Sequence, residues 1–373
     1  MARPRLSWSV VAVALGVMTH ATVAQLTIER SASILVFPRV VAAGDTDTVI
    51  QITNAGGGML FARCFYVNGA LANPALPPGP TNAPLWQQTE FRIALMPKQP
   101  THWVASRGRV NQDDPRCATS TVDCDGAGFD PSALVPAMTG FEGELVCVEV
   151  DAAGAPLGGD HLRGQATLRD RVNGVVKYDA VGIGGVPDQN NNDDVLCLGG
   201  GSSASCPTAA EYQACPEQWS LNHQSDGSED PLLGAGSAVT TTLTVVPCRH
   251  DFLQQIPSSV LLQFLVTNEL EQQFSASTTV TCWADRSLSS IDSVFTFSTL
   301  GTQFAKTRIR SANAPLPVAS HGFIVLARTV RVGSGSPAVA ATSGGNVYRE
   351  GTQQAADTIL LPPPVAPVVT RQP

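Results

Sequence analysis

The chain has 373 residues, a formal net charge of −8, only 14% charged residues, and 33 glycines with 27 prolines. This length exceeds what one hydrophobic core usually serves, and the Gly- and Pro-rich, charge-poor composition favours turn-rich β structure over long helices, so two β domains are expected. The acidic balance, with no basic stripe evident along the sequence, argues against a nucleic-acid partner because phosphate backbones would be repelled.

The N-terminus has the pattern of an export signal. Arg3 and Arg5 precede a short apolar core from Val10 to Val17, and small residues follow up to Ala24. Residues 1–24 are therefore predicted to be a signal peptide cleaved near Ala24, which makes the protein secreted, periplasmic or cell-surface. No later stretch reaches 18 uninterrupted apolar residues, so no transmembrane segment is expected in the mature chain.

The first β domain is predicted over residues 25–186. Its apolar runs have strand length, and within 48–53 Ile50 and Ile52 alternate with polar residues, as in a half-buried strand. Pro38 favours an edge strand or a bulge for the first run. The predicted strands cover 33–41, 48–53, 60–68, 91–105, 143–151, 164–170 and 175–183.

Residues 187–236 are rich in Gly, Asn and Cys and are predicted to connect the domains. A second β domain is expected over 237–361, followed by a Pro-rich tail over 362–373. The predicted strands of the second domain cover 239–248, 260–268, 276–285, 302–311 and 322–332.

A repeated pattern links the two domains. Apolar runs end in Thr53-Asn54 and in Thr267-Asn268, and each is followed by a polar interval and a strand-like run with a cysteine, Cys64 or Cys282. The fold class predicted is all-β, with two Ig-like β-sandwich domains from an internal duplication and long disulfide-stapled loops. A small Greek-key barrel is the alternative architecture.

Nine cysteines behind an export signal indicate an oxidising compartment and disulfide bonds. Proximity in the chain favours Cys117–Cys124 and Cys206–Cys215, and strand positions favour Cys64–Cys147 and Cys248–Cys282. Cys197 is then left over, although any of the loop cysteines could be the odd one and Cys197 could instead pair with Cys248.

One acidic loop resembles a calcium site in its spacing. Asp188, Asn190, Asn192 and Asp194 alternate as oxygen ligands of calcium loops do. However, Asp193 stands where glycine is expected and no glutamate follows. Asp226, Ser228 and Asp230 show a similar alternation that would suit a weak site. The competing interpretation is that the Asn and Asp side chains of both stretches cap turns. No cofactor is therefore predicted apart from weakly bound calcium.

No catalytic residues are predicted, because the nucleophile motifs of known hydrolases are missing and the histidines are dispersed. Glu142 and Glu144 share one face of a strand, where a solvated surface is the expected role. Sugar stacking would need exposed tryptophans. The candidates are Trp86, Trp103, Trp219 and Trp283.

The sequence thus predicts an exported, non-catalytic β-sandwich protein with a structural, adhesion or partner-binding role at the cell envelope. Its partner would be an extracellular protein or glycan. The alternatives are a carbohydrate- or calcium-dependent extracellular binding module and an extracellular hydrolase, and enzymatic activity is not expected.

Overall fold

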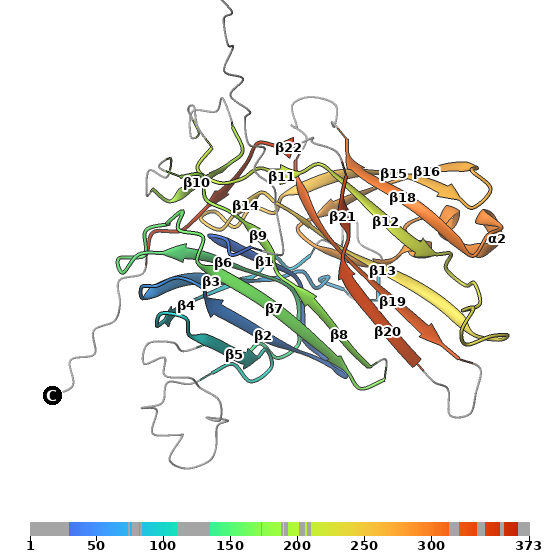
Figure 1. The fold of residues 1–373 in the computed structure, drawn as a ribbon, viewed down its shortest axis with the longest axis horizontal. Coiled ribbons are helices and arrows are strands. Elements are labelled where there is room, and N and C mark those ends of the chain that lie inside the picture. The colour runs from blue at the N-terminus through green and yellow to red at the C-terminus, as the bar shows by residue number, and fades with distance from the viewer. Residues whose placement is uncertain are drawn as a thin grey trace, which may run out of the picture.

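The computed structural model describes residues 30–73, 75–76, 82, 84–109, 135–172, 174–187, 189, 193–200, 206, 210–312, 321–333, 340–350 and 354–364. Within them the chain is nearly all β, with almost all strand pairs antiparallel and three very short helical turns (Figure 1). The predicted signal peptide, the pair Cys117 and Cys124, and the tail beyond residue 364 lie outside the described residues.

The first half of the molecule contains a nine-stranded sheet in the order β4-β3-β6-β1-β2-β7-β8, with β5 paired to β2 and β9 to β1. β1 and β2 pair only beside their connecting turn, at Ala42–Asp47 and Ala43–Thr46. The sheet folds over there, so that two layers enclose one apolar core. The strands are β1 (Ile34–Ala43), β2 (Thr46–Asn54), β3 (Leu60–Asn68), β4 (Gln88–Leu95), β5 (Pro100–Val104), β6 (Phe141–Val150), β7 (Leu162–Asp170), β8 (Gly174–Asp179) and β9 (Val181–Ile183).

The second half has two sheets, ordered β16-β15-β18-β12-β21 and β17-β13-β19-β20, around a core of their own. Its strands are β12 (Gln218–Gln224), β13 (Ala238–Pro247), β15 (Ser259–Asn268), β16 (Gln273–Thr281), β17 (Ala284–Ser287), β18 (Phe304–Ser311), β19 (Phe323–Val332), β20 (Ala340–Asn346) and β21 (Tyr348–Arg349). The helical turns are α1 (Leu288–Ile291), η2 (Ser293–Phe295) and α2 (Phe297–Leu300).

Short strands from the middle and the end of the chain join the halves. β10 (Val195–Leu198), β23 (Asp357–Leu360) and β14 (His250–Asp251) form a three-stranded sheet, and β11 (Cys215–Pro216) pairs with β22 (Gln354–Ala355). The described part of the segment predicted as a connection, residues 187–236, therefore contains strands that belong to these sheets. Its last strand, β12, pairs with β18 along all seven residues, so the second half begins before residue 237.

A third apolar core lies between the halves. Ile34 and Val36 of β1 point to the opposite face from Leu35 and Phe37, and they join Val246 of β13 in this shared core. β3 and β6 contribute to it as well, and both strands are accordingly buried along almost their whole length instead of at alternate residues. One layer of the first half is thus buried on both faces.

The repeated asparagines have the same structural role in each half. Asn54 is fully buried; its Oδ1 accepts the Gly56 N–H at 2.7 Å and its Nδ2 donates to the Gly58 carbonyl at 2.8 Å. Asn268 is also buried, and its Oδ1 accepts the backbone N–H of Leu270. Each side chain therefore satisfies the backbone of the turn that follows its strand.

The strands after these turns pair differently. β16 returns beside β15 as a hairpin, with Ser259 opposite Thr281 and Thr267 opposite Gln273. β3 instead crosses to the other layer and pairs with β4 and β6, while β2 pairs with β5 and β7. The shared turn chemistry is therefore not accompanied by one common strand order.

Replacing Asn268 with alanine should lower the free energy of unfolding by about 1–3 kcal/mol, because the buried Leu300 carbonyl, which accepts from Asn268 Nδ2 at 2.8 Å, would lose its donor. Urea unfolding of the oxidised protein measures this loss. Gln272→Ala is the control, since it removes only an exposed partner and should change stability by less than about 0.5 kcal/mol. Equal effects of the two variants would contradict the role given to Asn268.

Candidate functional site

The predicted calcium ligands can be placed only in part. Asp188, Asn190 and Asn192 lie outside the described residues. Asp194 Oδ1 lies 3.9 Å from Arg63 Nη1, and the Asp194 carbonyl accepts the Leu361 N–H, so Asp194 links the C-terminal strand region to β3. Burial raises the pKa of the Asp194 carboxyl. In the part of the chain that is described, no group of three His, Cys, Asp or Glu side chains is arranged to hold a metal ion.

The aspartates of the second acidic segment, residues 226–230, accept hydrogen bonds from backbone N–H groups. Asp226 is buried and accepts the Thr241 N–H at 2.7 Å and the Ser289 N–H at 2.9 Å. Asp230 accepts the backbone N–H groups of Leu232 and Leu233. The turn-capping interpretation therefore holds for Asp230, whereas Asp226 accepts from backbone groups far away in the sequence.

The Cys64–Cys147 bridge is present and lies within one layer. The two residues stand directly opposite each other on β3 and β6. The bond therefore joins neighbouring strands and not two facing sheets.

Two of the predicted cysteine pairs are wrong. Cys206 bonds Cys197 rather than Cys215, and Cys215 bonds Cys248 rather than leaving it to Cys282. Cys215 reaches Cys248 because Gly322 lies against it, where a Cβ would come within 2.3 Å of the Cys215 Cβ. Cys282 remains a buried free thiol, and burial raises its pKa, which makes it a poor nucleophile.

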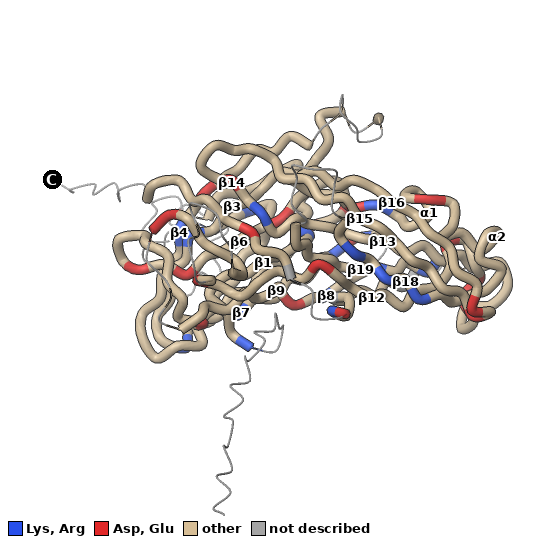
Figure 2. The backbone as a smooth tube through the Cα atoms, turned by 90° about the horizontal axis from the view of Figure 1, so that it is seen from above, with Lys and Arg blue, Asp and Glu red and all other residues tan. Residues whose placement is uncertain are grey.

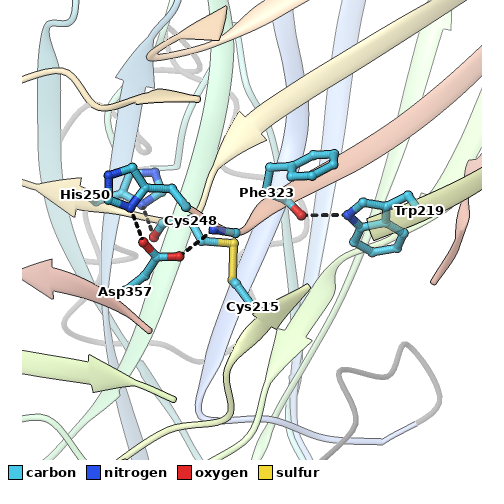
Figure 3. Close-up of a disulfide and its surroundings, with 8 residues drawn as sticks. Cys215, Trp219, Cys248, His250, Phe323 and Asp357 are labelled. Atoms are coloured by element: carbon cyan, nitrogen blue, oxygen red, sulfur yellow. Dashed lines mark hydrogen bonds and ion pairs between the residues drawn. A yellow bond between two sulfur atoms is a disulfide. The ribbon is translucent and has the colours of Figure 1, made fainter. Parts of the chain in front are cut away.

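A buried polar cluster surrounds the Cys215–Cys248 bridge (Figure 3). Asp357 of β23 accepts from the Gly322 N–H at 2.7 Å and contacts His321 Nδ1 at 2.7 Å. The neighbouring Trp219 donates its indole N–H to the Phe323 carbonyl at 2.7 Å. These contacts fasten β23, β11 and the start of β19 to one another.

His250 extends this cluster into the first half. Its Nε2 lies 2.9 Å from Glu144 Oε1, and the two side chains are 2% and 0% exposed. Burial alone would lower the pKa of His250, but the facing carboxylate outweighs it and the pKa is raised. Glu144 is thus a buried partner across the shared core, and the expectation that it lies on a solvated surface beside Glu142 is wrong.

None of the described histidines pairs with a serine or cysteine side chain. His223 Nε2 lies 2.8 Å from Thr307 Oγ1, but its Nδ1 faces the Gln224 carbonyl rather than a carboxylate. His161 contacts Glu149, and His321 contacts Asp357. These contacts fix strands in place and do not assemble a nucleophile with its base.

The four tryptophans considered for sugar stacking are buried. Trp103 is 2% exposed and donates to Tyr66 Oη, and Trp283 is 7% exposed and donates to the Pro38 carbonyl at 2.8 Å. Trp86 and Trp219 are buried as well. A stacking platform made of these tryptophans is therefore excluded.

A basic stripe on β18 is the feature that the sequence analysis missed. Lys306, Arg308 and Arg310 alternate with the buried Ala305, Thr307 and Ile309, so all three cations project from the outer face of the sheet. The pattern K-x-R-x-R at a period of two residues carried this signal. Figure 2 shows Lys and Arg positions along β18, on the side of the molecule away from the first half.

A groove of about 580 Å³ runs across this face. It lies over β16, β15, β18 and β12, whose outward side chains are mostly uncharged and polar. We call this surface the basic face; besides the three cations it includes Gln218, Gln263, Leu265, Ser275 and Ser277, and its groove is also bordered by the acidic residue Asp292.

The three cations have different partners. Glu350 binds Lys306 at 3.3 Å and Arg308 at 3.1 Å, and hydrogen bonding from Arg308 lowers the pKa of the Glu350 carboxyl. Arg310 instead donates through Nε and Nη2 to the neutral Gln263 Oε1, at 3.0 and 2.7 Å. The Arg310 guanidinium is thus held in a fixed orientation, and no carboxylate among the described residues forms an ion pair with it, as an anion-binding group requires.

No protein family matches the chain, and no curated protein has significant similarity to it. Among the described residues, no helix has the length and hydropathy needed to cross a membrane. Function is therefore inferred from the chain's own residues.

The His250–Glu144 pair predicts a pH dependence of stability. Because the folded-state pKa of His250 is raised, the folded protein keeps a proton that the unfolded chain loses above about pH 6.5. The stabilisation is therefore complete below that pH, and the free energy of unfolding should fall by up to about 1.4 kcal/mol per pH unit as pH rises through the folded-state pKa. Urea unfolding at closely spaced pH values measures the slope.

Glu144→Gln should abolish this slope, since the amide cannot hold a proton on His250. Glu149→Gln is the matched control: its partner His161 has a side chain that is 46% exposed, and the slope above pH 6.5 should persist. A slope that is unchanged in Glu144→Gln would contradict the assignment.

Proposed function

We propose that the protein is an exported, non-catalytic envelope protein that binds an anionic polysaccharide through the basic face. The observation that carries this proposal is the row Lys306, Arg308 and Arg310 on a strand whose orientation is fixed by pairing on both sides. The partner-binding role follows from the charge and rigidity of this row, because pre-organised cations lose little entropy when they bind an anion.

Export is supported by the cysteines and by the N-terminal sequence. Three disulfide bonds lie within the described residues, and such bonds persist in oxidising compartments outside the cytosol. Residues 1–24 would act as the signal peptide, and the mature chain would be secreted, periplasmic or held at the cell surface.

We further propose that the two halves are Ig-like sandwiches that arose by duplication. The equivalent roles of Asn54 and Asn268 support a common origin, as does the pairing of β1 with β6 and of β13 with β19. Divergence of the strands after each asparagine would then account for the different pairing of β3 and β16.

A polysaccharide is favoured as the partner by the chemistry of the basic face. Hydroxyl and amide groups of Ser275, Ser277, Gln218 and Gln263 surround the cations, and such groups suit the hydroxyls of a sugar chain. The groove is shallow and extends across several strands, as an extended chain requires. Uronate, sulfate or phosphate groups would provide the negative charge for Arg308 and Arg310.

The test is binding of the oxidised protein to immobilised heparin, alginate and neutral dextran. Immobilised heparin or alginate should retain the protein, and immobilised dextran should not. Retention should weaken as the salt concentration rises because the contacts are ionic. The double variant Arg308→Gln/Arg310→Gln should weaken binding about tenfold or more, since each substitution removes a charge-assisted hydrogen-bond donor.

The matched control is Arg169→Gln/Lys177→Gln, which removes two exposed cations from β7 and β8 on the first half. This control should leave binding within about twofold of the wild type, as expected for charges distant from the site. Equal losses in both double variants would indicate attraction by overall charge alone, and absence of binding to both anionic polysaccharides would refute the proposal.

A further inference from the structure

Strand β16 has one side without a partner. It pairs with β15 from Gln273 to Thr281, and in the described part of the chain its backbone has no hydrogen-bonded neighbour on the other side. Both overall views place it at the periphery of the second half (Figures 1 and 2). An edge of nine residues in regular β conformation is a template for another strand.

The sequence of this edge has none of the usual protection. QFSASTTVT contains no charged residue, no proline and no glycine, and Phe, Thr and Val favour β structure. Other strands at sheet margins are short, charged or covered: β21 has two residues, β17 has four and carries Asp285 and Arg286, β5 begins with Pro100, and β4 carries Glu90 and Arg92. At β20, Gly344 lies so close to Val176 of β8 that a Cβ would approach it to 2.5 Å.

We propose that β16 pairs antiparallel with β16 of a second copy of this chain, with Ser277 at the two-fold axis. In this register Phe274 faces Val280 of the other copy, Ser275 faces Thr279, and Ala276 faces Thr278. Aromatic–β-branched and Ser–Thr pairs are favourable cross-strand neighbours. A second copy is thus the occupant that the sequence of β16 itself fits, and because β16 carries no charge its own side chains bring no like charges together.

The pairing preserves the sidedness of each strand. The alternation of exposure along β16 puts Ser275, Ser277 and Thr279 on the outer face and Phe274 and Ala276 toward the core. A two-fold axis perpendicular to the sheet keeps the outer faces of both copies on the same side. Two five-stranded sheets then become continuous, and both basic faces point in one direction.

The dimer would strengthen binding to a long polyanion through two linked sites. The dimer itself does not depend on the proposed function, because it rests on β16 alone. A dimer that binds no polysaccharide would refute the proposed function and leave the pairing intact, and a monomer that binds polysaccharide would do the reverse.

The test is the mass of the oxidised full chain in sedimentation velocity over a range of concentrations. The wild type should pass from monomer to dimer as concentration rises. Ser277→Lys and Ser277→Asp should each raise the dissociation constant about tenfold or more, because like charges then meet at the axis. An equimolar mixture of the two variants should regain dimer, since lysine faces aspartate in the mixed pair.

Ser298→Lys is the matched control: Ser298 is an exposed serine on α2, outside the sheet, and this variant should dimerise as the wild type does. Recovery in the mixture also shows that both Ser277 variants are folded. A wild type that stays monomeric at all concentrations would overturn the proposal. Dimerisation of Ser277→Lys with wild-type affinity would overturn it too, as would a mixture that remains monomeric while each variant unfolds like the wild type.

Discussion

Burial of the β1-β3-β6 layer on both faces is the constraint on which the rest of the structure depends. One face closes the core of the first half, and the other, through Ile34, Phe65 and Val146, needs cover from elsewhere in the chain. The second half supplies it with Val246 and Ile324. An apolar sheet face of this size would otherwise be exposed to water or available for aggregation. Each half therefore needs the other to bury this face, although each also has its own core.

The polar groups in this shared core follow from the same constraint. An interface made only of aliphatic side chains would pack in several registers. His250, in contrast, contacts the carboxylate of Glu144, and Trp283 donates to the Pro38 carbonyl, so only one register satisfies both groups. The Gln88 side chain adds a further contact, donating to the Phe252 carbonyl at 2.8 Å. Each of these bonds crosses between the halves and fixes their relative position. The free-energy cost of burying the Glu144 carboxylate is offset by its hydrogen bond with His250.

The fold was predictable to the extent that local pattern determines it. Alternation placed β2 correctly and an apolar run ending in Thr-Asn placed β15, and the hydrogen bonds of Asn54 and Asn268 in the following turns explain why both strands end there. Layer assignment could not be predicted in this way, because whether β16 returns beside β15 or crosses over depends on distant strands. Burial of Glu144 was likewise invisible, since its partner His250 lies 106 residues away.

The pairing of the cysteines could not be predicted for the same reason. Cys197, Cys206 and Cys215 are separated by equal intervals of nine residues, so the proximity on which the Cys206–Cys215 prediction rested applied equally to Cys197 and Cys206. The choice is made by tertiary structure, which brings Cys215 to Cys248 beside Gly322. By contrast, the row Lys306, Arg308 and Arg310 was visible in the sequence at strand periodicity. It was missed because the overall acidic charge was taken to describe every surface of the molecule.

The distribution of charge on the second half explains how one surface can serve two contacts. Cations are concentrated on β18, in the middle of the sheet, while β16 at the margin has no charge. Between them lies β15, where Gln263 holds Arg310 in place. A charged edge would oppose association of two copies, and an uncharged centre would not attract an anion. Separating the two by one strand would allow the same sheet to form the proposed pair at its edge and to bind the proposed polyanion across its face.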